Sequence, residues 1–138
     1  MKLNKMKLKF GAAVLAATMS LGITAFAASG TITYKDISAE YSLKCDFGWK
    51  IFKDDDSAKA DTKMVGGKKS GHRVACRLEM WEDSSGVTTY KYESDDVWAQ
   101  CNITYSDVYC FKSRHSIDNS NNTKELVVKA LSEKEPLN

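Results

Sequence analysis

Residues 41–51 of the chain are YSLKCDFGWKI, a stretch in which apolar side chains occupy every second position. Successive side chains of a β-strand point to opposite faces of its sheet, so a period of two is typical of a strand with one face on a core. The stretch therefore predicts a half-buried strand. Its core face is expected to carry Tyr41, Leu43, Cys45, Phe47, Trp49 and Ile51.

Similar patterns occur on both sides of this stretch. Residues 31–37 (TITYKDI) predict a short strand before it, and residues 72–81 (HRVACRLEMW) predict another strand after it. The turn residues EDSSG follow, so residues 87–93 (VTTYKYE) are expected to return as a hairpin partner.

The segments between the strands decide the fold class. Residues 53–71 are polar and rich in glycine and charge, which indicates a long connection with at most one weak strand at residues 58–65. No segment before residue 120 has a helical period, and no β-α-β alternation is present. Six or seven short strands predict an all-β fold, a small antiparallel β-sandwich of residues 28–120.

The polar C-terminal tail, residues 121–138, is left open by its pattern. A short helix is slightly favoured, because Asn122 would cap it with Glu125 at the third helical position. The segment KELVVKAL also alternates, so a final strand or a frayed tail is the alternative.

The first 27 residues predict a cleaved signal peptide. Four lysines precede an apolar run of about seventeen residues that closes on the small-x-small site Ala25–Phe26–Ala27. The alternative, a membrane-spanning helix, would have an apolar run at the lower length limit, interrupted by a glycine and hydroxyl residues. We expect cleavage between Ala27 and Ala28, export by a bacterium, and no membrane span afterwards.

Cleavage also changes the charge of the chain. The full sequence has 20 Lys and Arg against 18 Asp and Glu, and removal of the four leader lysines leaves a formal charge of −2. Nucleic-acid binding needs many cations on one face. No nucleic-acid partner is therefore expected.

The four cysteines of the exported chain are expected to pair. Oxidising compartments favour disulfides, and cysteine-ligated zinc sites usually contain two cysteines two to four residues apart, whereas the shortest separation here is nine. Two structural disulfides, each contributing roughly 2–4 kcal/mol, are predicted for Cys45, Cys76, Cys101 and Cys110. Of the three connectivities, Cys45–Cys110 with Cys76–Cys101 is favoured.

A second expected hairpin supplies the candidate binding face. Residues 97–105 and 108–117 are separated only by Ser106 and Asp107, and such a loop would fix the register of two adjacent strands. One face would then combine aromatic rings with amide and hydroxyl groups, as a sugar- or peptide-binding sheet offers. The candidate ligand-binding residues are Trp98, Gln100, Asn102, Tyr109, Phe111 and His115. The alternative is that these rings pack beneath the long connection.

Catalytic and metal-binding motifs are not found. His72 and His115 lie in no metalloprotease or hydrolase pattern and are expected to be isolated surface histidines. The acidic runs at residues 54–56 and 93–96 contain oxygen ligands suited to calcium but lack EF-hand spacing. We therefore expect solvated loops there, and no enzyme activity, metal or cofactor.

Three segments are similar in order and spacing to small secreted bacteriocins of the lactococcin-like β-sandwich class. They are SGHRVACRL, VWAQCNI and DVYCFK, which together span about forty-five residues. The resemblance implies an antibacterial role, while the four cysteines and the long tail depart from that pattern.

Two functions follow as expectations. The first is a secreted, non-enzymatic binding protein whose partner is a cell-surface glycan, cell-wall material or another protein. The alternative is a bacteriocin- or toxin-like antibacterial effector.

Overall fold

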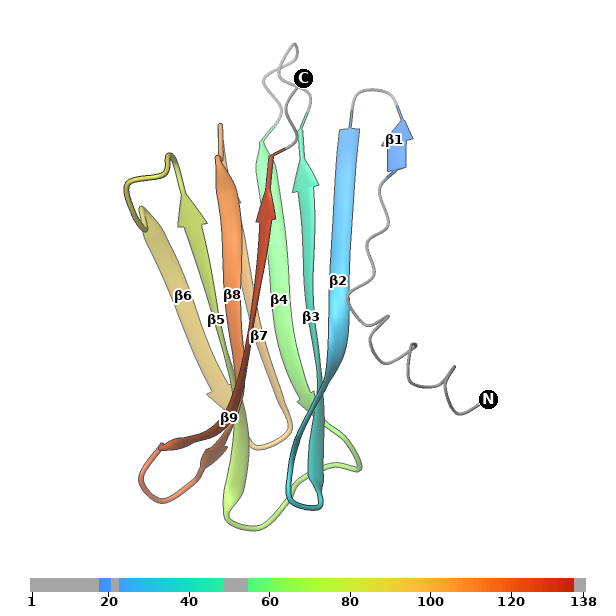
Figure 1. Ribbon diagram of the computed structural model, residues 1–138, viewed down its shortest axis with the longest axis vertical. Helices are drawn as coiled ribbons and strands as arrows, with labels where there is room; N and C mark the ends of the chain where they lie inside the picture. The colour runs from blue at the N-terminus through green and yellow to red at the C-terminus, as the bar shows by residue number, and fades with distance from the viewer. Residues whose placement is uncertain (1–17, 21–22, 49–54, 136–138) are drawn as a thin grey trace.

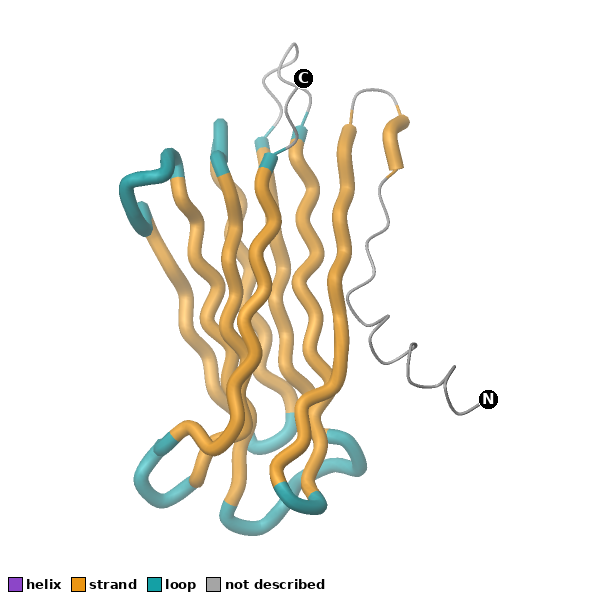
Figure 2. The backbone as a smooth tube through the Cα atoms, viewed as in Figure 1, coloured by secondary structure: helices purple, strands orange, loops and turns teal. Residues whose placement is uncertain are grey.

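The computed structural model describes residues 18–20, 23–48 and 55–135, and these form two antiparallel β-sheets packed face to face (Figure 1). The described part consists of strands and loops without a helix (Figure 2). Accordingly, it contains no helix of the length and apolarity needed to cross a membrane. The predicted all-β antiparallel fold is confirmed.

The first sheet, called sheet A, has the strand order β1-β2-β3-β4-β7. Its strands are β1 (Thr18–Ser20), β2 (Ile23–Tyr34), β3 (Ile37–Phe47), β4 (Asp56–Met64) and β7 (Trp98–Tyr105). The predicted strand at residues 41–51 is confirmed as far as Phe47, and Trp49 and Ile51 lie outside the described residues.

The second sheet, called sheet B, has the strand order β6-β5-β8-β9. Its strands are β6 (Thr89–Asp95), β5 (His72–Trp81), β8 (Cys110–Asn119) and β9 (Glu125–Lys134). The predicted hairpin between residues 72–81 and 87–93 is confirmed, because β5 and β6 pair in antiparallel register.

The second predicted hairpin is wrong. β7 pairs with β4 in sheet A, whereas β8 pairs with β5 and β9 in sheet B. Between them the chain crosses from one sheet to the other, with Asp107 at a φ of 60°. Val108 follows as a fully buried residue, and its N–H donates to Asp56 Oδ2 at 2.7 Å. A two-residue link in a sequence does not distinguish a hairpin from such a crossing.

The segment expected to be a long connection contains a central strand, β4. Its inward positions are buried and mostly small, while lysine and aspartate alternate with them on the outer face. Two alanines and a threonine gave little hydrophobic signal, although they fit closely against a second sheet. The buried positions of β4 are Asp56, Ala58, Ala60, Thr62 and Met64.

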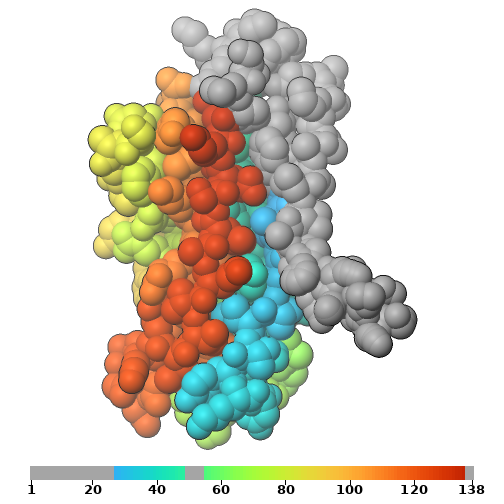
Figure 3. Space-filling model, viewed as in Figure 1, coloured from blue at the N-terminus to red at the C-terminus, as the bar shows by residue number. Residues whose placement is uncertain are grey.

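The C-terminal tail is a strand rather than a helix. β9 pairs along β8, with a register irregularity at Ile117 and Asp118, and its Val127 and Leu131 pack against the core. Figure 3 shows β9 in red, lying between the orange β8 and the blue residues of β2, and β9 also contacts β2. The slightly favoured helix is therefore wrong, and the alternating pattern of KELVVKAL was the correct signal.

The core lies between the two sheets and includes a polar chain centred on His115. This histidine is fully buried, so the expected surface position is wrong. Thr62 Oγ1 donates to the carbonyl of Ala75 at 2.9 Å and therefore accepts from His115 Nδ1 at 2.9 Å. Nε2 then accepts from Ser113 Oγ at 2.8 Å. Because Thr62 belongs to sheet A and His115 to sheet B, this chain joins the sheets.

A second feature of the core is the contact between Gly30 and Tyr41, which are partners on β2 and β3. A Cβ added at Gly30 would lie 2.7 Å from Tyr41 Cζ. The tyrosine is nearly buried, and its ring centroid is 5.2 Å from that of His115. Glycine at position 30 is therefore required by the position of this ring.

The buried imidazole predicts a stability that falls in acid. Burial lowers the pKa of His115 from 6.5 to about 4, so between these values the unfolded chain binds a proton that the folded chain excludes. The free energy of unfolding should decrease by about 3 kcal/mol as the pH falls from 7 to 4 through this group alone. Urea unfolding across that range measures it. His115→Gln should lose this component, and His72→Gln should keep it; equal pH profiles for the three proteins would contradict the assignment.

The Gly30–Tyr41 contact predicts that Gly30→Ala destabilises the fold by about 1–3 kcal/mol, because the added methyl overpacks the site. Gly86→Ala is the matched control, since a Cβ there meets no atom within 4 Å. Urea denaturation of both variants, and of Gly30→Ala combined with Tyr41→Leu, checks the cause. The double variant should recover part of the loss, and an unchanged loss would place the strain elsewhere.

Candidate functional site

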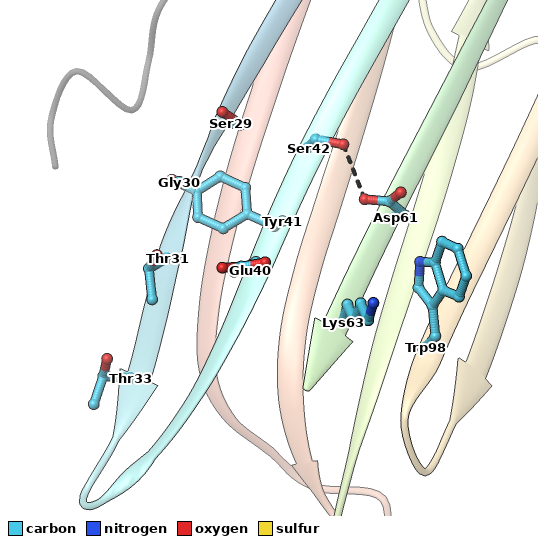
Figure 4. Close-up of a pocket in the computed structure, with 10 residues that line it drawn as sticks. All are labelled: Ser29, Gly30, Thr31, Thr33, Glu40, Tyr41, Ser42, Asp61, Lys63 and Trp98. Atoms are coloured by element: carbon cyan, nitrogen blue, oxygen red, sulfur yellow. Dashed lines mark hydrogen bonds between the residues drawn. The ribbon is translucent and has the colours of Figure 1, made fainter. Parts of the chain in front are cut away.

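A broad depression lies on the outer face of sheet A. It has a volume of about 720 Å³ and crosses strands β2, β3, β4 and β7. Figure 4 shows its side chains spread across the sheet, with Trp98 at one side. The lining residues are Ser29, Gly30, Thr31, Thr33, Glu40, Tyr41, Ser42, Asp61, Lys63 and Trp98.

The strand register arranges the polar lining in two rows that run across the strands. One row is Thr31, Glu40, Lys63 and Trp98, and the next is Ser29, Ser42, Asp61 and Gln100, of which all but Gln100 line the depression. Neighbouring strands lie about 4.8 Å apart, so each row offers one functional group per strand at that spacing. This arrangement suits a flat, extended ligand more than a compact one.

Trp98 is held in place by its backbone and by a cation. Asp95 Oδ2 accepts the N–H groups of Val97 at 2.8 Å and Trp98 at 2.9 Å. These two bonds favour the ionised carboxylate and lower the pKa of Asp95. Lys63 Nζ lies 5.0 Å from the centroid of the Trp98 ring, which remains 45% exposed. The ring is thus fixed at the border of the depression with apolar area open to solvent.

The remaining side chains of the depression are mostly polar, and its charged residues are Glu40, Asp61 and Lys63. Ser42 Oγ donates to Asp61 Oδ1 at 2.9 Å, as Figure 4 shows. Among the described residues, no hydrogen-bond partner is found for the side chain of Glu40, nor for that of Gln100, which lies outside the lining as the register partner of Asp61. Hydroxyl groups, two carboxylates and one ammonium group therefore line the depression beside one aromatic ring, with an excess of one negative charge.

Three of the six predicted binding residues share this outer face. Trp98, Gln100 and Asn102 alternate along β7 with buried residues, and the first of them lines the depression. The other three do not join them. Phe111 and His115 are fully buried in sheet B, and Tyr109 precedes β8 with Lys134 Nζ 5.0 Å from its ring centroid. The aromatic face proposed for the second hairpin does not form.

Sequence reasoning missed the groups contributed by β2, β3 and β4. Glu40, Ser42, Asp61 and Lys63 fall on the polar face of alternating segments, so the signal was present in the period of two. The alternation identified the outward face of each strand. It did not show that the outward faces of four strands together form one depression.

The structure contains no disulfide among its described cysteines, so the two predicted bridges are not supported. Cys76 Sγ and Cys101 Sγ are nevertheless 3.2 Å apart, on β5 and β7 of opposite sheets. Cys45 faces the interior, whereas Cys110 is in register with Trp81 and alternates in phase with Lys112 on the outer side of sheet B. Burial raises the pKa of both Cys45 and Cys110, so neither is an activated thiol.

The expectation of solvated acidic loops is wrong for Asp56, which is buried in β4, and for residues 93–95, which belong to β6. Asp56 Oδ1 accepts from the N–H of Gly48 at 2.7 Å and its Oδ2 from that of Val108, while Asp95 holds the turn before Trp98. Asp54 lies outside the described residues. Within the described ranges, no group of three or more His, Cys, Asp or Glu side chains is arranged to hold a metal ion.

Comparison with known proteins gives no relative: no protein-family model, no curated protein and no solved structure matches the chain.

Proposed function

We propose that the protein is a secreted, non-enzymatic binding module that recognises a glycan at a bacterial cell surface. The observation that carries the proposal is the depression of about 720 Å³ on the outer face of sheet A, with Trp98 at its border. Sugar rings present apolar faces edged by hydroxyl groups, so an aromatic ring beside many small polar groups is complementary to them.

The charge of the face supports a neutral ligand. Along β3 and β4 the outward acids Glu40, Asp46 and Asp61 are matched by Lys44, Lys59 and Lys63. A charged polymer would gain little net attraction from such a surface. A neutral chain that exchanges hydrogen bonds with successive strands would use the rows as they stand.

Export is the second part of the proposal and rests on the leader sequence. Most of the predicted signal peptide lies outside the described residues, and its expected cleavage point, Ala27–Ala28, falls within β2. Cleavage would leave Ala28–Tyr34 paired with β3, which retains Ser29, Thr31 and Thr33 in the depression.

The third part is a disulfide between Cys76 and Cys101. Their sulfur atoms, 3.2 Å apart, need to approach by only about 1.2 Å to reach bonding distance. Oxidation would transfer two electrons and two protons from the thiols to an extracytoplasmic disulfide by thiol–disulfide exchange. The bond would link the sheets and contribute about 2–4 kcal/mol. The second bridge, Cys45–Cys110, is not favoured. Cys45 on β3 faces the core between the sheets, whereas Cys110 on β8 alternates in phase with the outer side of sheet B.

The disulfide can be tested by counting thiols in exported protein. We expect an intact mass about 2 Da below the all-thiol value, and alkylation in denaturant of Cys45 and Cys110 only. Peptide mapping without reduction should recover Cys76 linked to Cys101. A mass about 4 Da lower would restore the two-bridge expectation, and four alkylated thiols would remove the proposal of a disulfide.

The binding site can be tested with Trp98→Ala. Loss of the stacking ring should weaken binding to soluble cell-wall oligosaccharides by about ten-fold or more, measured by calorimetric titration. Tyr90→Ala is the matched control, because this tyrosine is similarly exposed and also lies under a cation, but on the outer face of sheet B. It should bind as the wild type does.

Other outcomes of the same experiment separate the functions. Equal loss of binding in both variants would reject the glycan site. Failure of the wild-type protein to bind any cell-wall glycan would reject it as well. Growth inhibition of related bacteria by the added protein, without glycan binding, would support the bacteriocin-like alternative.

A further inference from the structure

A second, smaller hollow lies on the outer face of sheet B. It has a volume of about 220 Å³, and its floor contains two small residues, Ala75 and Ser116, which are partners on neighbouring strands. Sites for drug-sized ligands begin at about 300 Å³, so a hollow of this size suits one ring-sized group rather than an extended chain. Its lining residues are Ala75, Cys76, Arg77, Tyr92, Arg114, Ser116 and Glu125.

The charged side chains of the lining are already engaged with protein groups. Arg77 donates from Nε to Glu79 at 2.8 Å, and its guanidinium group lies 3.8 Å from the centroid of the Tyr90 ring. Arg114 donates to both carboxylate oxygens of Glu125, at 3.1 and 2.7 Å. Because each of these ions has a partner of its own, the hollow has little attraction for a charged ligand.

The next row of the sheet contains two buried polar atoms without a partner. Arg73 and Asp118 are opposite each other in register, and each is two residues along its strand from the floor of the hollow. No ion pair joins them, and Arg73 Nε and Asp118 Oδ1 both lack a hydrogen bond within the described structure. Asp118 is only 2% exposed. Unpaired buried polar atoms cost free energy, so a group that pairs with both atoms would be bound favourably.

The two unpaired atoms have opposite requirements. Arg73 Nε carries a hydrogen and needs an acceptor, whereas the carboxylate oxygen of Asp118 needs a donor. A hydroxyl group meets both needs, because its oxygen accepts one hydrogen bond while its hydrogen is donated in another. An ionised anion has no hydrogen for Asp118, and an ammonium group has no lone pair for Arg73. The pair therefore favours a neutral ligand that carries hydroxyl groups.

Tyr92 supplies an apolar surface beside these polar atoms. Its side chain lines the hollow and is 51% exposed. Tyr90, on the same strand, is similarly exposed but lies outside the lining, with the guanidinium group of Arg77 over its ring. Sugar rings present apolar faces edged by hydroxyl groups, so they match an aromatic ring next to paired donor and acceptor atoms.

We infer that this hollow is a second binding site, which takes a single neutral sugar unit. One hydroxyl group of the sugar lies between Arg73 and Asp118, and its apolar face lies against Tyr92. The site belongs to sheet B and shares no residue with the depression on sheet A, so the inference does not rest on the proposed function. With one site on each outer face, a single molecule can bridge two glycan chains and gain avidity from both.

Amide NMR titration of the exported protein with glucose and with N-acetylglucosamine tests the inference. The amide of Ser116 should shift saturably with at least one of the two sugars. Asp118→Leu, which removes the acceptor and keeps a similar size, should weaken binding by about ten-fold. Tyr92→Ala should weaken it by a similar factor. Tyr90→Ala is the matched control and should change it less than about two-fold.

Filling the hollow gives a second pair of variants. Ala75→Leu should abolish the shift of Ser116, whereas Ala130→Leu should keep it, because Ala130 is exposed on β9 outside the lining. Trp98→Ala should also keep it, which separates this site from the depression on sheet A.

Three outcomes would overturn the inference. The first is the absence of a saturable shift at Ser116 with either sugar. The second is equal weakening of binding by Tyr90→Ala and Tyr92→Ala. The third is saturable binding of acetamide without binding of sugar, which would assign the hollow to a peptide group instead.

Discussion

The carboxylate of Asp56 is buried at the end of the sandwich where the chain passes between the sheets, and both of its oxygens accept backbone N–H groups. One bond reaches Gly48, just after β3, and the other reaches Val108, just before β8. This single side chain therefore fixes the start of β4 relative to the preceding strand and to the crossing into sheet B. A buried carboxylate is tolerated only when such bonds replace its hydration. Asp56 therefore needs both backbone N–H groups, and these are brought to it only by the folded chain.

From this constraint follows the position of β4 between β3 and β7. Its inward alanines allow a close approach of the second sheet, and its outward Asp61 and Lys63 complete the two polar rows of the depression. The same strand contributes Thr62, which carries the hydrogen-bond chain to His115. Packing, polar core and candidate site thus meet on one strand of nine residues.

The two outer faces of the sandwich have different chemistry. Sheet A presents balanced charges, hydroxyl groups and one fixed tryptophan, whereas sheet B presents paired arginines, lysines and stacked aromatic rings. Arg77 lies 3.8 Å over the ring of Tyr90, and Lys112 lies 3.8 Å over that of Trp81. Such contacts hold cations near the surface without burying them.

The sequence by itself determined the class of fold, the inward face of β3, the β5–β6 hairpin and the outward position of Trp98, because the period of two depends only on the alternation of a strand's side chains. It did not determine which strands are neighbours. Ser106 and Asp107 fit a hairpin as well as a crossing, and only the burial of Val108 against Asp56 selects the crossing. Phe111 and His115 were therefore assigned to a surface when they belong to the core. The depression on sheet A was decided by the tertiary structure alone, since it depends on the register of strands distant in sequence, which no local pattern contains.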